Sequence, residues 1–278
     1  MFDSTTQAQD VAAAFQGEIS GKTFVITGVG FGGLGAAVCE ALAPYSPGLL
    51  IITGRDIQRP QAFVKALITQ YADLKISVIQ MDLASTKSVE NAVQEIEKIA
   101  SRIHVLVNNA GVMCIPDRTL TETGIQAHLA INYLGHFLLA KLLAEHLSSP
   151  EASGRVINVS SSAHAVSPFR FGDPHFFGSS DLPPDEEPSR DACLAFGIPW
   201  ESGYSPLVAY AQSKTAVILH ARAISCGVLK DGITAFSVNP GVPVKGPPRY
   251  YLQHYTHWLK TMLEATWKIA TTPDQCDM

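Results

Sequence analysis

Residues 23–35 read TFVITGVGFGGLG, and this stretch decides the fold. The β-branched and aromatic residues of Thr23–Thr27 predict a buried strand, a glycine-rich turn follows it, and Ala36–Leu42 is helical in character. A strand, glycine turn and helix start in this order let backbone N–H groups meet a pyrophosphate, although a purely structural turn is the alternative. The pattern GxGxxG fits twice, so it leaves the glycine roles open: Gly28/Gly30/Gly33 and Gly30/Gly32/Gly35.

The rest of the chain repeats this alternation of strand and helix. Five further β-rich runs are each followed by a helical pattern or turn: Leu49–Thr53, Ile76–Met81, Val105–Asn108, Val156–Ser160 and Thr234–Val238. Between the third and fourth runs, apolar residues from Val89 to Ile99 fall at helical spacing, as in a helix that covers a parallel sheet. We therefore expect an α/β fold over residues 1–278. It is a single Rossmann-type doubly wound domain with a mainly parallel sheet of about six strands.

Composition excludes several classes of partner. The net charge of −5 is not gathered in runs, so neither a nucleic-acid face nor a membrane-binding basic patch is expected. Leu129–Leu147 is strongly apolar, but Asn132, His136 and Lys141 interrupt it, so a core helix is predicted and no membrane span. Residues 1–20 lack the layout of a signal peptide, and the 5 cysteines are widely spaced. A cytoplasmic protein with a small-molecule substrate is expected.

Ser167–Pro206 departs from the alternation. The segment is rich in Pro, Gly, Asp and Glu and carries several aromatic residues: Phe169, Phe171, Phe176, Phe177, Phe196 and Trp200. A long connection of this kind is either a substrate-covering lid or a disordered insertion. Because disordered segments are poor in aromatic residues, the composition favours a partly ordered lid.

The ends of the predicted strands carry candidate cofactor residues. An acidic residue after the second strand would bind the ribose 2′-hydroxyl of NAD, but the chain has Gly54 there, with Arg55 next to it. An arginine suits a 2′-phosphate, which favours NADP(H), whereas a solvated arginine is the alternative. Asp82 and Asn109 end the next two strands, where they lie near a dinucleotide or are ordinary turn residues.

Tyr210 and Lys214 are the strongest catalytic candidates. Their spacing of four puts a phenol and an ammonium on one helix face, where the cation stabilises a phenolate. Such a tyrosine can exchange a proton with a substrate oxygen near neutral pH. Tyr71 and Lys75 have the same spacing, so only the surroundings recommend the pair at Tyr210.

Two polar residues supply those surroundings. Ser161 follows the fifth strand, where its hydroxyl could bond a carbonyl, and Asn132 lies in an apolar helix, where its amide needs a partner such as water. Taken singly, Ser161 could be only a helix or turn cap, and Asn132 only a core amide with its hydrogen bonds satisfied. Together with Tyr210 and Lys214, in this order along a β/α chain, the two residues predict a catalytic group. No metal is expected, because the histidines lack ligand spacing: His128, His136, His146, His164 and His220.

Several short motifs occur together: Gly28 with Gly33-Leu34-Gly35, Asn108-Asn109-Ala110-Gly111, Asn132, Asn158-Val159-Ser160-Ser161, Tyr210-x-x-x-Lys214 and Asn239-Pro240-Gly241. Over residues 20–245 they resemble the short-chain dehydrogenase/reductase family. The phrases Ser160–His164 and Ala209–Lys214 are similar to its retinol-dehydrogenase-like branch, with its fungal biosynthetic members. That branch commonly uses NADPH, which agrees with Arg55.

The resemblance implies a role for each residue of the group. Tyr210 is the general acid/base and Lys214 lowers its pKa and holds the nicotinamide ribose. Ser161 positions the carbonyl, Asn132 anchors a proton-relay water, and the cofactor supplies the hydride. The implied NADP(H)-binding residues are Gly28, Gly33, Leu34, Gly35, Arg55, Asp82, Asn109, Tyr210, Lys214 and Val242.

Three departures from the family pattern carry expectations. One extra residue between Gly28 and Gly33 predicts a wider loop that still binds phosphate. Val242 and its neighbours stand where the family often has a threonine, so one cofactor contact is expected to be missing or replaced by backbone. The chain ends at Met278, where relatives continue through a helix and a seventh strand. We expect an uncovered sheet edge there, through which copies of the chain could form a homo-oligomer.

The expected function is NADP(H)-dependent reduction of a carbonyl, or oxidation of an alcohol, on a small and apolar substrate, in secondary-metabolite biosynthesis. One rival is a relative that binds NADP(H) without turnover, as a cofactor sensor or inactive homologue. Another is sugar-nucleotide epimerisation on the same fold, which also uses a tyrosine and a lysine. The intact Ser161, Tyr210 and Lys214 argue against the first, and the short C-terminal part argues against the second.

Overall fold

A computed structural model describes residues 6–148, 153–178, 182–195, 197–198 and 203–241 of the chain. Two expectations fall outside these ranges: the cofactor contact at Val242, and the chain end at Thr272–Met278 with its consequences for the sheet edge. Both remain predictions from the sequence.

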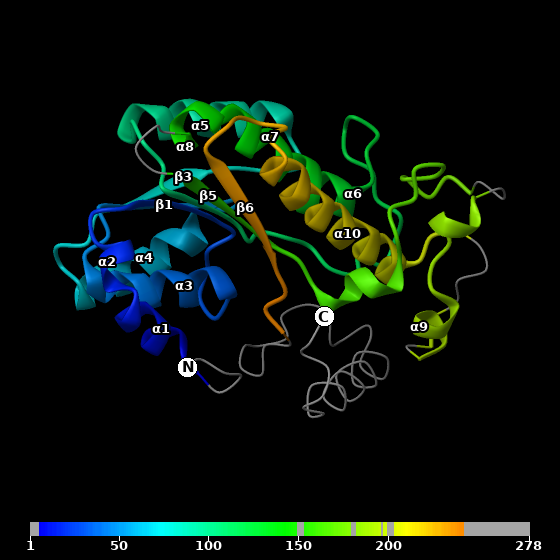
Figure 1. The fold of residues 1–278 in the computed structure, drawn as a ribbon, viewed down its shortest axis with the longest axis horizontal. Helices are drawn as coiled ribbons and strands as arrows, with labels where there is room; N and C mark the ends of the chain where they lie inside the picture. Colours follow the sequence, from blue (N-terminus) through cyan, green and yellow to red (C-terminus); the bar gives the residue numbers. More distant parts are fainter. Residues whose placement is uncertain (1–5, 149–152, 179–181, 196, 199–202, 242–278) are drawn as a thin grey trace.

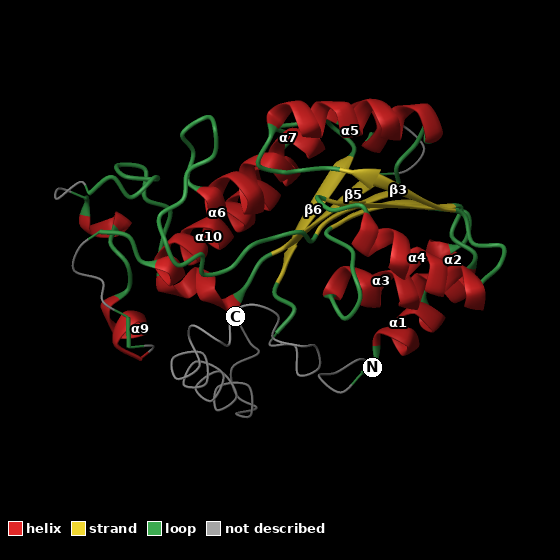
Figure 2. Cartoon of the chain, turned by 180° about the vertical axis from the view of Figure 1, so that it is seen from behind, coloured by secondary structure: helices red, strands yellow, loops and turns green. Residues whose placement is uncertain are grey.

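Six strands form one sheet in the order β3-β2-β1-β4-β5-β6, with every neighbouring pair parallel (Figures 1 and 2). The strands are β1 (Thr23–Thr27), β2 (Leu49–Gly54), β3 (Ile76–Gln80), β4 (Val105–Asn108), β5 (Gly154–Val159) and β6 (Ile233–Val238). The predicted single α/β domain is confirmed. β1 and β4 have the predicted bounds, and β2, β3 and β6 differ from prediction by one residue at one end. β5 begins two residues earlier and ends one residue earlier than predicted.

Helices cover both faces of the sheet (Figure 1). One side carries α1 (Ala8–Ala14), α2 (Gln16–Ile19), α3 (Leu34–Leu42) and α4 (Gln58–Gln70). The other carries α5 (Thr86–Ile99), α6 (Ala127–Leu129), α7 (Gly135–Leu142), α8 (Ala144–Leu147) and α10 (Pro206–Ser225). A short α9 (Arg190–Ala195) lies away from the sheet, and single 3-10 turns occur at Ala43–Tyr45, Ser162–Val166 and Pro184–Glu186.

Alternation along the strands divides the core into two layers. Val25 and Ile51 point to the side of α5, α7 and α10, where they pack with residues such as Ile96. Their neighbours Ile26 and Ile52 point to the side of α1, α3 and α4. Because both faces of each central strand are buried, the strands read as continuous apolar runs, as the sequence of β1 and β2 does.

The predicted core helix at Leu129–Leu147 is divided. α6 leads into a π-helical turn at Ala130–Leu134, in which the Gly135 N–H donates to the Ala130 carbonyl, and α7 and α8 follow. The spacing of apolar residues indicates that the stretch is buried. A π-helical turn leaves this apolar pattern nearly unchanged, so the sequence does not predict the turn. Within the described ranges, no helix is both long and apolar enough to cross a membrane.

The sheet order reverses direction between β1 and β4. Connections from β1 lead outward on one side to β2 and β3, and those from β4 lead outward on the other to β5 and β6. In open parallel sheets, ligands bind beside the carboxyl ends of the strands at such a switch point. The turns after β1, β4 and β5 meet there.

Candidate active site

The turn after β1 is pressed against the turn after β4. Gly28 has a φ of +71°, and a Cβ added to it would lie 2.6 Å from the Cα of Ala110. A Cβ added to Gly35 would lie 2.9 Å from Nδ2 of Asn109. Glycine is therefore required at both positions by the backbone conformation or by close packing.

The start of α3 has no side-chain cap. α3 begins after Gly33, and the N–H groups of its first turn are therefore available to an anion. A Cβ added to Gly30 would meet nothing within 4 Å, and Leu34 is exposed. The extra residue of the loop is accommodated by a turn in which the Gly33 N–H donates to the Gly30 carbonyl at 3.1 Å.

The ends of β2 and β3 carry the residues considered for the adenosine side of a dinucleotide. Arg55 is exposed, and only its backbone carbonyl has a described hydrogen bond, from Nε2 of Gln80 at 3.1 Å. Gly54 is crowded, since a Cβ added to it would lie 3.3 Å from Cγ of Pro60. Asp82 accepts the Ala84 N–H on Oδ1 at 2.9 Å, so one carboxylate oxygen forms a turn.

Asn109 joins the first and fourth strand ends. Its Nδ2 donates to the backbone carbonyls of Thr27 at 2.8 Å and Gly28 at 3.1 Å. Its side chain is thereby committed to holding the glycine turn, and any effect of Asn109 on a cofactor acts through the position of that turn.

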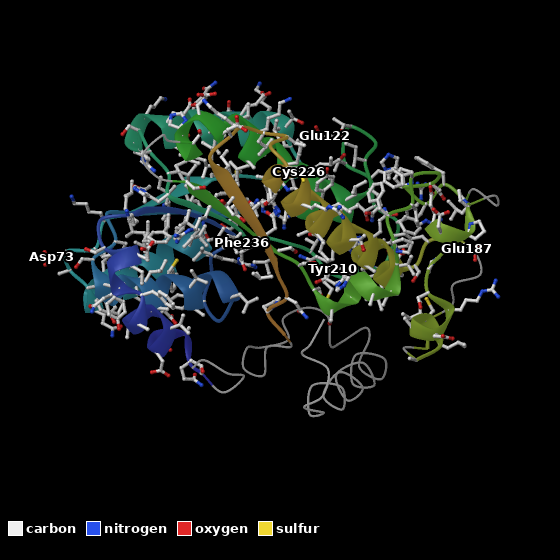
Figure 3. All side chains as sticks on the ribbon, viewed as in Figure 1. Asp73, Glu122, Glu187, Tyr210, Cys226 and Phe236 are labelled. Atoms are coloured by element: carbon white, nitrogen blue, oxygen red, sulfur yellow. The ribbon has the colours of Figure 1, made fainter. Side chains whose placement is uncertain are left out.

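Tyr210 is labelled on α10 in Figure 3, and Lys214 lies one turn further along the same helix. The Nζ of Lys214 is 5.6 Å from the centroid of the Tyr210 ring and donates to the Val159 carbonyl at 2.7 Å. Lys214 is 5% exposed, and burial lowers its pKa from 10.5 to about 8. Tyr71 and Lys75, by contrast, lie beyond the end of α4 and share no helix.

The turn after β5 contains two serines with different structural roles. Ser161 is partly exposed, and its Oγ accepts the Ala163 N–H at 3.2 Å, which makes it the cap of the 3-10 turn at Ser162–Val166. Ser160 is buried, and its Oγ donates to the Lys214 carbonyl at 3.0 Å. The sequence analysis missed Ser160, which fixes α10 against the end of β5.

Asn132 is 1% exposed, and each polar group of its side chain has a partner. Its Oδ1 accepts the Val112 N–H at 2.8 Å, and its Nδ2 donates to the Val112 carbonyl and to Oγ of Ser213. Ser213 in turn donates to the Tyr210 carbonyl at 2.6 Å. Gly111 lies between Asn132 and Lys214, since a Cβ added to it would be 3.1 Å from Oδ1 of Asn132 and 3.8 Å from Nζ of Lys214.

The described part of Ser167–Pro206 is anchored to α10. Gln212, buried on α10, accepts the Arg170 N–H on Oε1 at 3.3 Å and donates to the Pro174 carbonyl at 2.9 Å. Arg170 pairs with Asp173 at 3.4 Å and lies over the Phe176 ring at 4.6 Å. The partly ordered lid stays a prediction, and Phe196 and Trp200 lie outside the described ranges.

Three histidines beside the site are buried and neutral. Burial lowers the pKa of His128 to about 4, of His136 to about 3 and of His220 to about 4. In the part of the chain that the structure describes, no group of three or more His, Cys, Asp or Glu side chains could hold a metal.

Acid should destabilise the fold through these imidazoles. Their folded pKa values lie below the ordinary value of 6.5, so between that pH and about 4 the unfolded chain binds more protons. The contribution of these histidines to the free energy of unfolding is fully present above pH about 6.5. It falls as the pH drops towards their pKa values in the folded state. We expect the melting temperature to fall by several degrees between pH about 7 and about 5. His164→Gln, at an exposed imidazole, should leave the slope unchanged, and a flat melting profile would contradict the prediction.

The sequence model described as short chain dehydrogenase matches residues 22–172. The chain is 84% identical over 244 residues to the oxidoreductase fscI of Fusarium equiseti, covering 87% of this chain and 95% of that protein. It is 32% identical over 225 residues to retinol dehydrogenase 13 of Mus musculus, covering 81% of this chain and only 59% of that one.

Among solved structures, the Pseudomonas aeruginosa RhlG/NADP active-site complex has the same fold, with a TM-score of 0.59 and 20% identity. The match covers 88% of this chain and 80% of that one. The expected similarity to retinol dehydrogenases is confirmed by the curated relatives. With the glycine turn, the parallel sheet and the matched sequence model, these findings show that the chain belongs to the short-chain dehydrogenase family.

Proposed function

We propose that this oxidoreductase transfers a hydride between NADP(H) and the carbonyl or alcohol carbon of a small, apolar substrate. The observation that carries the proposal is the buried Lys214, whose Nζ lies 5.6 Å from the centroid of the Tyr210 ring and donates to the Val159 carbonyl, two residues before Ser161. Asn132 bonds Ser213 on the same helix. A cofactor sensor would need the open glycine turn but not a buried lysine next to a tyrosine. The geometry therefore favours turnover over the sensor.

The residues present fit a bound dinucleotide. The uncapped first turn of α3 offers the N–H groups of Leu34 and Gly35 to a pyrophosphate, while Gly33 forms the turn before it and Gly30 leaves space beside it. Arg55 is exposed and offers a guanidinium to a 2′-phosphate. Asp82 and Asn109 border the same edge of the sheet and shape it through their turns.

The chain's own residues supply the proton chemistry, while a bound nicotinamide would supply or take up the hydride. In reduction, Tyr210 would donate its proton to the substrate oxygen as the carbonyl carbon gains the hydride, and solvent would reprotonate the phenolate that remains. Lys214 stabilises that phenolate, and the Ser161 hydroxyl donates to the same substrate oxygen.

Asn132 contributes by position. Both hydrogens of its amide are used by Val112 and Ser213, so a relay water would have to bind an acceptor oxygen of Asn132. Through Ser213, the amide also holds the backbone of Tyr210.

The substrate is proposed to be apolar because of the cluster around Tyr210. Its buried members are Cys114, Val166, Phe176, Cys193, Ile198, Leu207, Val208, Ala209 and Ala211. Tyr204 closes over it, with its hydroxyl donating to the Ile115 carbonyl at 2.6 Å. Residues 167–206 contribute several of these side chains, which supports their proposed role as a substrate lid.

A role in secondary metabolism and a cytoplasmic location complete the proposal. The first is supported by identity to a fungal oxidoreductase, and the second by the four described cysteines, which are free thiols. The retinol dehydrogenases among the relatives suggest long apolar alcohols, aldehydes or ketones as the first substrates to try.

The deciding experiment is oxidation of NADPH with a panel of ketones, aldehydes and quinones. Turnover of any of them removes the sensor alternative. Tight binding of NADPH without turnover across the panel would favour the sensor, and conversion of a nucleotide sugar without net cofactor oxidation would favour epimerisation.

Cofactor preference gives a separate prediction. With Gly54 in place of an acid and Arg55 exposed beside it, NADPH should bind at least about tenfold more tightly than NADH, about 1.4 kcal/mol. Arg55→Ala should remove most of that difference by weakening NADPH alone. Arg155→Ala is the matched control, since Arg155 is an exposed arginine at the amino end of β5 that pairs with Glu18. Equal affinities in a fluorescence titration of the wild type would contradict the NADP assignment.

A further inference from the structure

A buried histidine connects the end of β1 with the helix that follows Asn132. Nδ1 of His136 lies 3.1 Å from the Asn132 backbone oxygen, and Nε2 lies 2.8 Å from Oγ1 of Thr27, 109 residues away. His136 is 2% exposed and Thr27 is fully buried. Neither contact is open to exchange with solvent.

The partners of His136 fix which nitrogen carries the proton. A carbonyl oxygen can only accept, so Nδ1 must be the N–H that donates to Asn132. Burial, with smaller contributions from the nearby Lys214 and His220, lowers the pKa of His136 to about 3 and so keeps the ring neutral. Nε2 is then an acceptor, and the Thr27 hydroxyl donates to it.

This donation also fixes the hydroxyl of Thr27. Oγ1 accepts the N–H groups of Asn109 at 3.0 Å and Ala110 at 2.9 Å, which fills its acceptor capacity. The other acceptor within reach is the Val107 carbonyl at 3.4 Å, a much weaker partner than Nε2. His136 therefore fixes the orientation of the Thr27 hydroxyl, whose oxygen accepts two N–H groups of the turn after β4.

The link continues to the catalytic candidates. Asn132 is bonded through its side chain to Ser213, which holds the Tyr210 carbonyl. The π-helical turn at Ala130–Leu134 interrupts the regular backbone ladder at this point. A continuous set of hydrogen bonds thus runs from Thr27, next to the glycine turn, through His136 and Asn132 to α10.

We propose that His136, as the neutral tautomer protonated on Nδ1, is a positioning residue. It sets the separation between the dinucleotide turn and the Tyr210–Lys214 helix. This inference rests on the proposed function, because a cofactor and a substrate would have to meet between these two parts.

The tautomer is tested first, on the wild-type protein. Imidazole ¹⁵N spectra should show His136 protonated on Nδ1 and neutral from pH about 5 to about 9, because it is buried and its partners are fixed. A His136 that is protonated on Nε2, or that titrates in this range, would overturn the proposal. This measurement needs neither substrate nor a variant that folds.

The positioning role is tested by a double-mutant cycle on NADPH affinity and on kcat. Thr27→Val and His136→Leu should each weaken NADPH binding about tenfold and lower kcat. The double variant should be little worse than either single one, because both break the same link. Thr27→Ser, which keeps the hydroxyl, should restore near wild-type values.

The matched control is His220→Leu, at another buried imidazole, which packs on Tyr133 and Phe137. It should lower the melting temperature but leave NADPH affinity unchanged. Additive losses in the cycle, or an equal loss of affinity in His220→Leu, would overturn the positioning role. If the wild type does not bind NADPH, the proposed function fails and the positioning role with it, whereas a wrong tautomer overturns the link alone.

Discussion

Replacement of Tyr210 by phenylalanine should lower kcat by about a hundredfold or more and change NADPH affinity by less than about twofold. The reason is that only the phenolic hydroxyl is lost. The ring keeps its place against His128, whose centroid is 6.3 Å away, and the Tyr210 backbone is still held by Ser213. Initial rates on the best substrate of the panel, together with a fluorescence titration of NADPH, separate the two effects.

Tyr71→Phe is the matched control. Tyr71 has a lysine four residues later, as Tyr210 does, but it lies beyond the end of α4, where its hydroxyl accepts from Gln70. The Tyr71→Phe variant should keep the kcat of the wild type. A Tyr210→Phe variant with a near wild-type rate would remove Tyr210 from the mechanism, and parallel losses in both variants would point to a general effect on the fold.

The sheet could be predicted from the sequence because strand burial leaves a local signal. β1 and β2 are covered on both faces, so nearly every residue of Thr23–Thr27 and Leu49–Thr53 is apolar or β-branched, and the runs show where the strands lie. The turns after the strands are also local, since glycine and asparagine mark them. The carboxyl ends of parallel strands share one edge, so the candidate residues at those ends could be expected to meet.

Hydrogen bonds between distant elements could not be predicted in this way. Thr27 and His136 are 109 residues apart, and Ser160 reaches the Lys214 carbonyl across 54 residues. Each is an ordinary residue of its own strand or helix, with no spacing that points to the other. The sequence therefore indicates His136 as a polar residue within an apolar helix and as a histidine without ligand spacing, but it does not indicate its bond to Thr27.

Residues 167–206 show the same limit. Their composition favours partial order, but it does not indicate which contacts hold the described residues in place. The order comes from Gln212 on α10, which bonds Arg170 and Pro174, and from Asp173, which accepts the N–H groups of Phe177 and Gly178. A glutamine on a helix between Tyr210 and Lys214 carries no sequence signal of that contact.

Lys214→Met should have opposite effects on activity and stability. Without the cation the Tyr210 phenolate is no longer stabilised, and kcat should fall by about a hundredfold or more. Yet burying that cation costs the folded state free energy, because its pKa is lowered to about 8 by loss of solvation. With the folded pKa below the ordinary value, the unfolded chain binds the extra proton between pH about 8 and about 10.5. Wild-type stability therefore contains a term that rises with pH across that window.

The variant lacks this term. At neutral pH and without cofactor, Lys214→Met should be more stable than the wild type by roughly 1 to 3 kcal/mol. This is the desolvation cost that it avoids, less the hydrogen bond from Nζ to the Val159 carbonyl that it loses. The advantage should shrink as the pH rises through about 10.5, above which the wild-type lysine is neutral in both states. Denaturant unfolding at several pH values measures the difference. A variant that is less stable than the wild type at every pH would mean that the hydrogen bond to Val159 outweighs the burial of the charge, and that Lys214 is held in place for the fold as well as for the chemistry.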